Sequence, residues 1–391
     1  MRYRVFASLL AAVVAAVGAA LYARSRADPL PDRAPLSLQA FLASDGVEGF
    51  ARAESPIAFE FPRDHGPHPT YRIEWWYFTG HIESEAGRRF GYQLTFFRRA
   101  LAPVTADRAS AWAANQVYMA HFAITDGAAG THESAERLSR AAVGLAGAVG
   151  EPFRVWVDGW SAESTGAPTF PMRLRAGDEG VSMDLVLDRP KHIVRHGDDG
   201  LSVKTTDGSA ASYYYSITRV NTSGEIDVNG SRHAVTGSSW IDREWSTSVL
   251  DAQHVGWDWF SVQLNDGAEL MCFRMRHADG PGASYVTGTY VDAGGSARAV
   301  DGAAIEINAV GSWKSPRDGA IYPSGWRLSL AREGISLDLA PLVKDQEMNL
   351  SFRYWEGAVC ATGNRGGAPL SGHGYVELTG YGAPQAATAK P

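Results

Sequence analysis

Short runs of aromatic and β-branched residues, each followed by a turn-forming segment, recur along most of this chain. Residues 71–78 (YRIEWWYF) and 91–97 (GYQLTFF) flank a polar segment at 83–89, which is the pattern of a β-hairpin. Residues 117–125 form another such run, which ends at Asp126. Strand and helix patterns do not alternate, so the sequence predicts an all-β protein and excludes a doubly wound α/β sheet.

The rest of the chain continues this pattern, with one exception. Residues 134–149 are rich in Ala and place Glu136 and Arg140 four positions apart, which predicts a helix. A chain of 391 residues with 45% apolar residues is long enough for two hydrophobic cores. The further runs that predict strands are residues 153–157, 183–187, 212–220, 256–264, 270–275, 284–291, 326–330 and 375–378.

An internal similarity predicts two related β domains. The motif WWYF at residues 75–78 leads through a turn to FR at 97–98, and WDWF at 257–260 leads to FR at 273–274. The alternative is a chance similarity between aromatic strands. The predicted segments are a linker at 27–50, an N-terminal domain at 51–230, a C-terminal domain at 231–383 and a tail at 384–391.

The first 26 residues carry an export signal. Two Arg precede an uncharged apolar run at residues 5–22, two more Arg follow it, and no acidic residue occurs. Eighteen residues can just span a bilayer, so we expect an uncleaved N-terminal membrane anchor, with a cleaved signal peptide as the alternative. In either case the body is exported to the periplasm or the extracellular space, and only residues 1–26 contact the membrane.

Charge and cysteine content exclude several classes of protein. The net charge is −7 and residues 1–26 contribute four positive charges, so the remainder carries −11, which argues against nucleic acid as a partner. The two cysteines, Cys272 and Cys360, are too few for a disulfide scaffold or a Cys-based zinc module. A single disulfide and two buried thiols remain open. His192 and His196 lack the HExxH pattern, and no nucleotide-binding motif occurs, so we expect neither a metal nor a cofactor.

The segment GSSWIDREWST contains the candidate catalytic residues. If it is extended, Trp240, Asp242 and Glu244 share one face of the strand. Contact with an indole ring would desolvate a carboxyl group and raise its pKa, which makes a general acid available near neutral pH. The alternative is structural: Asp242 and Glu244 would pair with Arg243 or Arg274 and hold two strands together.

Tryptophans on the next strand, and a similar face in the first domain, are candidates for ligand contacts. Trp257 and Trp259 share a face, from which they could line an apolar pocket or stabilise a cation through their π faces. The alternative is an aromatic core. The candidate ligand-binding residues are Glu74, Trp76, Trp240, Trp257, Asp258 and Trp259.

Five ordered segments resemble the AttH/CrtC family, which covers lipocalin-like secreted proteins, carotenoid 1,2-hydratases and fungal pericyclases. The resemblance spans residues 50–380. It implies two lipocalin-like antiparallel β-barrel or sandwich domains packed side by side, with a ligand cavity in or between them. The segments are EWWYFTGHI at 74–82, GYQLTFFR at 91–98, SYYYSITR at 212–219, SWIDREWS at 239–246 and GWDWFSVQL at 256–264.

The resemblance also implies roles for individual residues. The family's hydratases protonate an isolated double bond and let water attack the resulting tertiary cation. Asp242 would be the acid, the three tryptophans at 240, 257 and 259 would stabilise the cation, and Tyr215 would be an auxiliary donor. In the hydratases, the equivalent Asp tends to be followed by His, whereas Arg243 and Glu244 follow it here. An adjacent Arg would favour the ionised form of Asp242.

Three functions from different classes therefore remain. The first is an exported lipocalin-like protein that binds a hydrophobic or amphipathic small molecule, in association with ABC transporter components. The second is a hydro-lyase that hydrates an isoprenoid- or carotenoid-like alkene. The third is a secreted hydrolase that uses Asp242 and Glu244 as a glycosidase does. A dry cavity lined by Trp favours the first two, and an open polar cavity favours the third.

Overall fold

The computed structural model describes residues 47–104, 110–248, 250, 253–280 and 284–382, which belong to one compact unit spanning 37–391. The regular structure of these residues is β-strand, apart from short 3-10 helices such as η1 (Arg63–His65) and η3 (Gly302–Ala304). The all-β prediction is therefore confirmed. No helix within the described ranges has the length and apolar character needed to cross a membrane. The predicted N-terminal helix and the tail at 384–391 lie outside these ranges.

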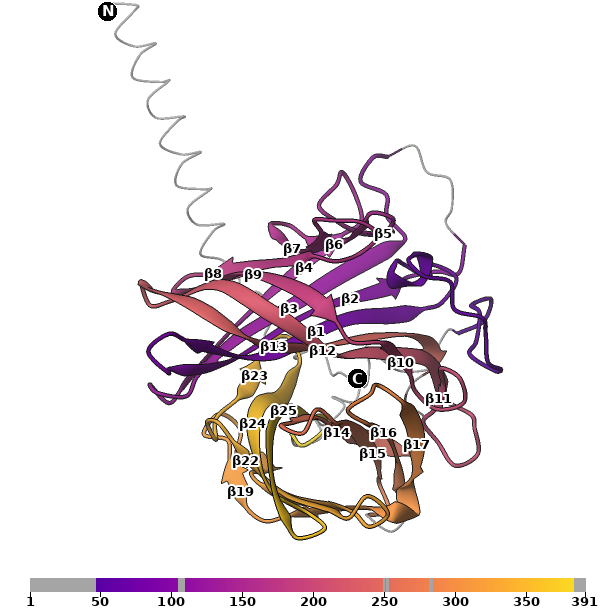
Figure 1. Ribbon diagram of the computed structural model, residues 1–391. Coiled ribbons are helices and arrows are strands. Elements are labelled where there is room, and N and C mark those ends of the chain that lie inside the picture. Colours follow the sequence, from indigo (N-terminus) through magenta and orange to yellow (C-terminus); the bar gives the residue numbers. More distant parts are fainter. Residues whose placement is uncertain (1–46, 105–109, 249, 251–252, 281–283, 383–391) are drawn as a thin grey trace, which may run out of the picture. The chain divides into compact units, whose positions relative to one another are not determined.

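The first of two large sheets is antiparallel, has 13 strands and curves into a nearly closed barrel, indigo to magenta in Figure 1. Its order is β4-β3-β2-β1-β13-β12-β9-β8-β7-β6-β5, and β10 and β11 also pair with β12. The strands are β1 (Ile73–Ser84), β2 (Arg89–Ala100), β3 (Gln116–Asp126), β4 (Thr131–Arg140), β5 (Ala146–Gly150), β6 (Phe153–Val157), β7 (Trp160–Ser164), β8 (Met172–Asp178), β9 (Val181–Pro190), β10 (Ile193–Arg195), β11 (Leu201–Val203), β12 (Ala211–Val228) and β13 (Ser231–Ser248).

The second sheet, orange to yellow in Figure 1, has ten strands and lies beside the first. Its order is β17-β16-β15-β14-β25-β24-β22-β21-β18; β23 pairs with β24, and β19 and β20 form a separate hairpin. The ten strands of the sheet are β14 (His254–Leu264), β15 (Glu269–His277), β16 (Tyr285–Val291), β17 (Ala297–Asp301), β18 (Ile305–Ala309), β21 (Trp326–Leu330), β22 (Ile335–Pro341), β23 (Glu347–Asn349), β24 (Arg353–Arg365) and β25 (Ala368–Leu378). The separate hairpin consists of β19 (Ser312–Lys314) and β20 (Ile321–Pro323).

The helix predicted at residues 134–149 is wrong, because this segment forms most of β4 and β5. β4 pairs with β3 along its whole length, and Glu136 contacts His121 of β3 rather than Arg140, with 3.0 Å between its Oε2 and the imidazole Nε2. Between the two strands, Val143 and Gly144 have φ values of 46° and 79°, which a helix does not allow. Cross-strand pairing therefore overrides the local preference of an Ala-rich sequence.

The two sheets repeat one strand order, with the hairpins β1–β2 and β14–β15 at equivalent positions. In both hairpins an acidic residue lies opposite an Arg: Glu74 opposite Arg98, and Asp258 opposite Arg274. The register differs by two residues from the alignment of WWYF with WDWF, because this pairing makes Trp259, not Trp257, the equivalent of Trp75. The internal similarity thus reflects a shared topology.

Sheet membership changes later in the chain than the predicted domain boundary at residue 230. That position lies in the turn between β12 and β13, which pair with each other in the first sheet. β13 also pairs with β1 over twelve positions, from Ser84 to Ile73 on the β1 side. The segment that contains Asp242 therefore belongs to the first sheet, and the chain enters the second sheet between residues 248 and 254.

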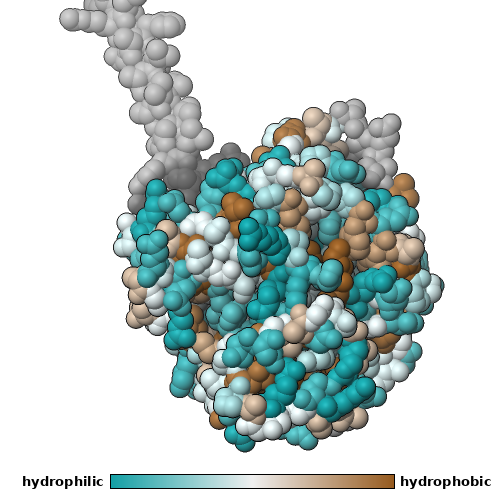
Figure 2. All heavy atoms as spheres, viewed as in Figure 1, coloured by the Kyte–Doolittle hydropathy of each residue, from teal (hydrophilic) through white to brown (hydrophobic). Residues whose placement is uncertain are grey.

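The three largest hydrophobic clusters of the described residues lie one inside each sheet and a third between the sheets. The third cluster includes Tyr77 and Tyr214 from the first sheet and Trp259 and Tyr375 from the second. A Cβ at Gly91 would lie 2.4 Å from the Cβ of Ala358, so the sheets approach closely where Gly91 lacks a side chain. Most of the surface seen in Figure 2 is hydrophilic, with only scattered hydrophobic residues, which is typical of a face that contacts water. Both cysteines are free thiols.

Candidate functional site

A cavity lies between the two sheets, where the third hydrophobic cluster meets polar side chains. The space between its lining atoms is about 860 Å³, part of it open to solvent. Nine of its seventeen lining residues are Trp, Tyr or Phe, and four are carboxylic acids. The predicted candidates Asp242, Glu244, Trp257 and Trp259 all line it.

Asp242 of β13 is buried at this cavity and is held by three donors. Trp240 Nε1 donates to its Oδ1 at 2.6 Å, Tyr214 OH donates to its Oδ2 at 2.6 Å, and Ser216 Oγ donates to Oδ1. These bonds favour the carboxylate, but burial outweighs them and raises the pKa of Asp242 to about 7. The carboxyl group can therefore be protonated close to neutral pH.

Further hydrogen bonds hold two of the donors to Asp242, Tyr214 and Ser216, in place. Trp259 Nε1 donates to Tyr214 OH at 3.0 Å, and His196 Nε2 lies 2.6 Å from Ser216 Oγ. The other ring nitrogen of His196 lies 2.8 Å from Thr289 Oγ1. Burial lowers the pKa of His196 to about 3, so its ring is neutral. His196 thus takes part in a hydrogen-bond network. Within the described ranges, no three His, Cys, Asp or Glu side chains are arranged to hold a metal.

Glu244 also reaches the cavity but differs from Asp242 in its partners. Lys204 Nζ lies 2.8 Å from Glu244 Oε1, and Ser212 Oγ donates to the same oxygen. The ammonium group of Lys204 in turn lies over the rings of Tyr214 and Phe273. Glu244 is therefore one partner of a buried ion pair, whereas no cationic side chain in the described part of the chain is paired with Asp242.

Two further acids, Glu356 of β24 and Glu377 of β25, lie on the wall that the second sheet contributes. They are directly opposite each other in the strand register. Tyr77 OH donates to Glu356 Oε1 at 2.6 Å, and Trp257 Nε1 donates to Glu377 Oε2 at 3.0 Å. Burial, aided by the neighbouring acids, raises the pKa of Glu377 to about 7 and that of Glu356 well above its usual range.

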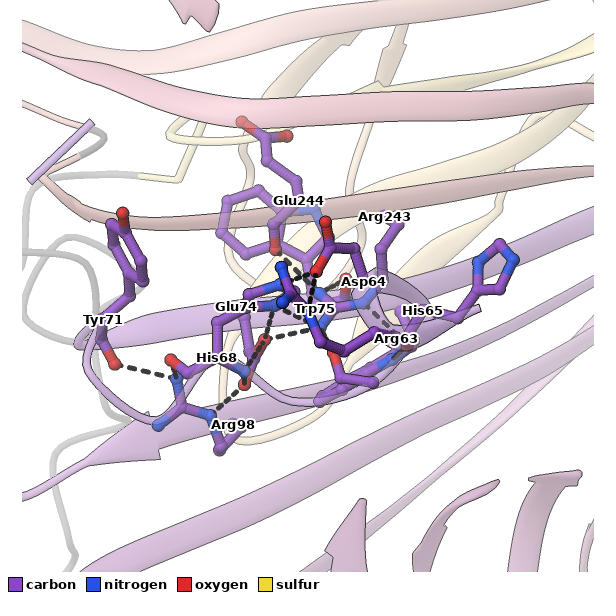
Figure 3. Close-up of polar contacts among 12 residues, drawn as sticks. Arg63, Asp64, His65, His68, Tyr71, Glu74, Trp75, Arg98, Arg243 and Glu244 are labelled. Atoms are coloured by element: carbon purple, nitrogen blue, oxygen red, sulfur yellow. Dashed lines mark hydrogen bonds and ion pairs between the residues drawn. The ribbon is translucent and has the colours of Figure 1, made fainter. Parts of the chain in front are cut away.

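The opposite face of the first sheet carries a buried ionic cluster, shown in Figure 3. Arg243 Nη2 donates to Glu74 Oε2 at 2.5 Å, and Arg98 Nε donates to Glu74 Oε1. The guanidinium of Arg243 also lies over the Trp76 ring, 3.9 Å from its centre. Although complete burial opposes ionisation, the two Arg hold the pKa of Glu74 well below its usual range.

Five predicted site residues do not line the cavity: Glu74, Trp76, Asp258, Tyr215 and Trp240. Glu74 and Trp76 point to the opposite face of the first sheet, and their neighbours Trp75 and Tyr77 line the cavity instead. The reason is the alternation of side chains along β1. Asp258 likewise points away, where it pairs with two Arg residues and accepts a hydrogen bond from a Tyr. Those partners are Arg274, Arg276 and Tyr381.

Tyr215 is the fourth of these residues, and its neighbour Tyr214 contacts Asp242. Tyr215 OH lies 2.6 Å from His65 Nδ1, on the face opposite the cavity. Trp240 also lies outside the cavity lining. It packs edge-on against Trp259 and donates a hydrogen bond to Asp242. A run of three tyrosines indicates that at least one points inward, but the pairing of β12 with β13 decides which one does.

The hypothesis that Asp242 pairs with Arg243 or Arg274 is wrong. Arg243 binds Glu74 and Arg274 binds Asp258. Strand alternation also separates Arg243 from the carboxyl group that precedes it in the chain, so the argument that this Arg would ionise Asp242 fails. The DRE sequence thus does not weaken Asp242 as an acid.

The sequence analysis did not identify Lys204, Tyr214, Glu356 or Glu377. One signal was present: Glu356 in YWEGAVCA and Glu377 in GYVELTG are single acids inside apolar strands. A charged residue is rarely buried without a partner or a function. What was missing was the pairing of β25 with both β14 and β24, which brings these acids to the cavity.

The chain is similar in sequence and structure to known proteins. A family model described as AttH-like matches residues 52–381. An AttH protein from Nitrosomonas europaea is 34% identical, with a TM-score of 0.75 over 85% of this chain and 100% of that chain. Kievitone hydratase from Nectria haematococca (16% identity, TM-score 0.62, 85% and 98% covered) and CghA (14%, 0.52, 86% and 97%) share the fold. No curated protein sequence matches the chain at a significant level.

Proposed function

This chain belongs to the AttH-like family, and we propose that it is a hydro-lyase that adds water to a carbon–carbon double bond. The substrate is an apolar, isoprenoid-like alkene bound between the two sheets. The observation that carries the proposal is the carboxyl group of Asp242, which is buried against an aromatic cavity and has a pKa near 7. A general acid works best when its pKa lies near the operating pH.

The first step transfers a proton from Asp242 to the less substituted carbon of the double bond. The π electrons form the new C–H bond, Asp242 becomes a carboxylate, and the other carbon becomes a tertiary cation. Trp240, Tyr214 and Ser216 donate hydrogen bonds to Asp242, so they stabilise the charge that it acquires. The indole rings of Trp257 and Trp259 provide π faces for the cation.

The second step is attack by water on the cation, followed by loss of one water proton to a base. The product is a tertiary alcohol, so one molecule of water has been added overall. The aromatic lining supports this assignment, because it lets water reach the cation only beside the polar side chains of the cavity. A hydrolase acting on sugars would need an open, polar cleft, and Glu244 would need to be free of its ion pair with Lys204.

The test uses geranylacetone and squalene, two probes with trisubstituted double bonds, in heavy-oxygen water. The wild-type protein should form alcohols that carry the heavy oxygen, as seen by mass spectrometry. Asp242→Asn, which keeps the shape of the side chain, should reduce the rate about 100-fold or more. Equal rates for the two proteins, or no product from the wild type with either probe, would count against the hydro-lyase.

A second candidate, a binding protein without catalysis, is favoured by the three donors around Asp242. A carboxyl group with that many donors is well arranged to remain an anion that orients a ligand. In that case Asp242→Asn should weaken binding of the natural ligand, and native mass spectrometry of protein purified from its host should show an unmodified ligand. Export and association with ABC transporter components remain predictions, which cell fractionation and affinity purification would test.

A further inference from the structure

We propose that Glu356 and Glu377 act as one unit that binds the attacking water and accepts its proton. The inference rests on the proposed hydration, because it names the base that this reaction needs. It makes the site two-sided: the acid, Asp242, comes from the first sheet and the base from the second.

The geometry of Glu356 carries the inference. Its carboxyl group is fully buried and lines the cavity. Oε1 accepts a hydrogen bond from Tyr77, whereas Oε2 has no hydrogen-bond partner among the described residues. A buried polar atom without a partner costs about 1–3 kcal/mol. Oε2 has almost no surface accessible to water as it stands, so a small rotation of the carboxyl group would bring it to a water molecule in the cavity and remove this cost.

Glu377 completes the unit from the neighbouring strand. It lies opposite Glu356 in the register of β24 and β25, and Cβ atoms in such pairs are about 5 Å apart. Trp257 fixes one oxygen of Glu377. Two carboxyl groups this close can both bind one water molecule, while their mutual repulsion opposes the loss of both protons.

The protonation of the two acids suits these roles. Burial raises both pKa values; the charge of Glu377 raises that of Glu356 further, and the charges of Glu244 and Asp242 raise that of Glu377. Above about pH 7 the unit therefore holds one proton, on Glu356. Glu356 is then the neutral donor and Glu377 the base. The titratable groups that face the unit from the surrounding strands are Tyr77, Asp242, Glu244, Tyr354 and Tyr375.

The proton balance closes with this assignment. Asp242 loses its proton to the alkene carbon, the water oxygen forms a bond to the cation, and one water proton moves to Glu377. Asp242 is then ionised and Glu377 neutral, so one proton must return from Glu377 to Asp242 before the next cycle. Because both pKa values are near 7, this return is close to thermoneutral. Glu244 is less suited to be the base, since Lys204 stabilises it as an anion.

Two isotopes separate the acid from the base. In deuterium oxide, reversible protonation by Asp242 puts deuterium into recovered squalene, which has no ketone whose α-hydrogens exchange with the solvent, whereas alcohol formation requires capture of water. Glu377→Gln should reduce alcohol formation about 100-fold while deuterium exchange persists, and Glu356→Gln should reduce it about tenfold. The double variant should be no worse than Glu377→Gln, because the two residues act as a unit.

The controls distinguish failure of this inference from failure of the hydro-lyase. Asp338→Asn removes an exposed carboxylate that pairs with Arg327 on β21, and it should retain wild-type rates. Asp242→Asn should lose both exchange and alcohol formation. Alcohol formation at the wild-type rate in Glu377→Gln would overturn the role of the unit while leaving the hydro-lyase intact. A wild-type protein that shows neither label would contradict the hydro-lyase.

Infrared spectroscopy tests the shared proton without any substrate. Near pH 9, the Asp242→Asn variant should still show the carbonyl stretch of a buried protonated carboxyl group, because Asp242 is absent and Glu377 is ionised at that pH. Adding Glu356→Gln to this variant should abolish the band. An identical band after this addition would overturn the assignment even if both probes prove not to be substrates.

Discussion

The two faces of β13 bury neighbouring residues in opposite electrostatic states. On the face opposite the cavity, Arg243 and Arg98 keep the fully buried Glu74 ionised. On the cavity face, Asp242 is as deeply buried but has only neutral donors, and its pKa rises to about 7. Burial alone therefore does not decide whether a carboxyl group is charged. A paired cation makes Glu74 a structural anion, and its absence makes Asp242 available as an acid.

This difference predicts opposite effects of pH on stability. The lowered pKa of Glu74 gives stability that is present above its unfolded value near 4.5 and is lost as the pH falls further. The raised pKa values of Asp242 and Glu377 mean that the folded state binds more protons than the unfolded state between about pH 4 and 7. Their contribution is therefore largest at low pH and declines as the pH rises through this window.

The largest effect is expected on the face of the first sheet opposite the cavity. Arg243→Met removes the donor to Glu74 and leaves a buried carboxylate with one Arg partner fewer, which should lower the free energy of unfolding by about 3–5 kcal/mol. Denaturant titration measures it. The matched control is Arg327→Met, which breaks an exposed pair with Asp338 and should cost about 1 kcal/mol or less. Equal losses in the two variants would show that the cluster around Glu74 is not a stabilising core.

The next effect belongs to the cavity face and concerns activity rather than stability. Asp242→Asn should lose about 100-fold in the rate of alcohol formation, equivalent to about 2.7 kcal/mol of transition-state stabilisation. Its stability should be close to that of the wild type near pH 4, where the folded state keeps Asp242 neutral, and should not fall below it at neutral pH, because no charge partner is left behind. A fall in stability like that of Arg243→Met would make the two faces alike and contradict the comparison.

A smaller effect should appear in the pH dependence of stability. Between about pH 4 and 7, one group with a raised pKa changes the free energy of unfolding by at most about 1.4 kcal/mol per pH unit. Asp242→Asn should reduce the decline of stability with rising pH in this window, and Glu377→Gln should do the same. Denaturant titrations at several pH values give these slopes. An unchanged slope in Asp242→Asn would mean that Asp242 is ionised throughout the window.

The smallest effect is expected from Trp257→Phe, which keeps an aromatic ring but removes the hydrogen bond to Glu377. Loss of one such bond should cost about 1 kcal/mol or less. The bond favours the ionised form of Glu377, so its loss should raise the pKa of Glu377 and move the pH–rate profile to higher pH. A shift to lower pH would contradict this role.

The sequence predicts the first-sheet wall of the site much better than the second-sheet wall. Alternation along one strand is enough to place Asp242 and Glu244 on a common face and Arg243 on the other. The same rule cannot tell which of Glu74 or Trp75 faces the cavity, because both faces of β1 are buried and both contain aromatic residues.

The second-sheet wall depends on contacts that are distant in the chain. Glu356 and Glu377 lie more than 100 residues after Asp242, and only the pairing of β25 with both β14 and β24 brings them to the cavity. The wrong helix at residues 134–149 has the same origin. Local composition favoured a helix, and pairing with β3 decided for strands.

The hydrogen bonds that cross between the sheets have a consequence for how such a protein can evolve. Trp259 of the second sheet donates to Tyr214, which holds Asp242, and Tyr77 of the first sheet donates to Glu356. If the repeated strand order records an ancestral duplication, neither half carried this site before the two were joined. Recombination that exchanges one half between distant relatives could then preserve two folded barrels and still destroy the chemistry.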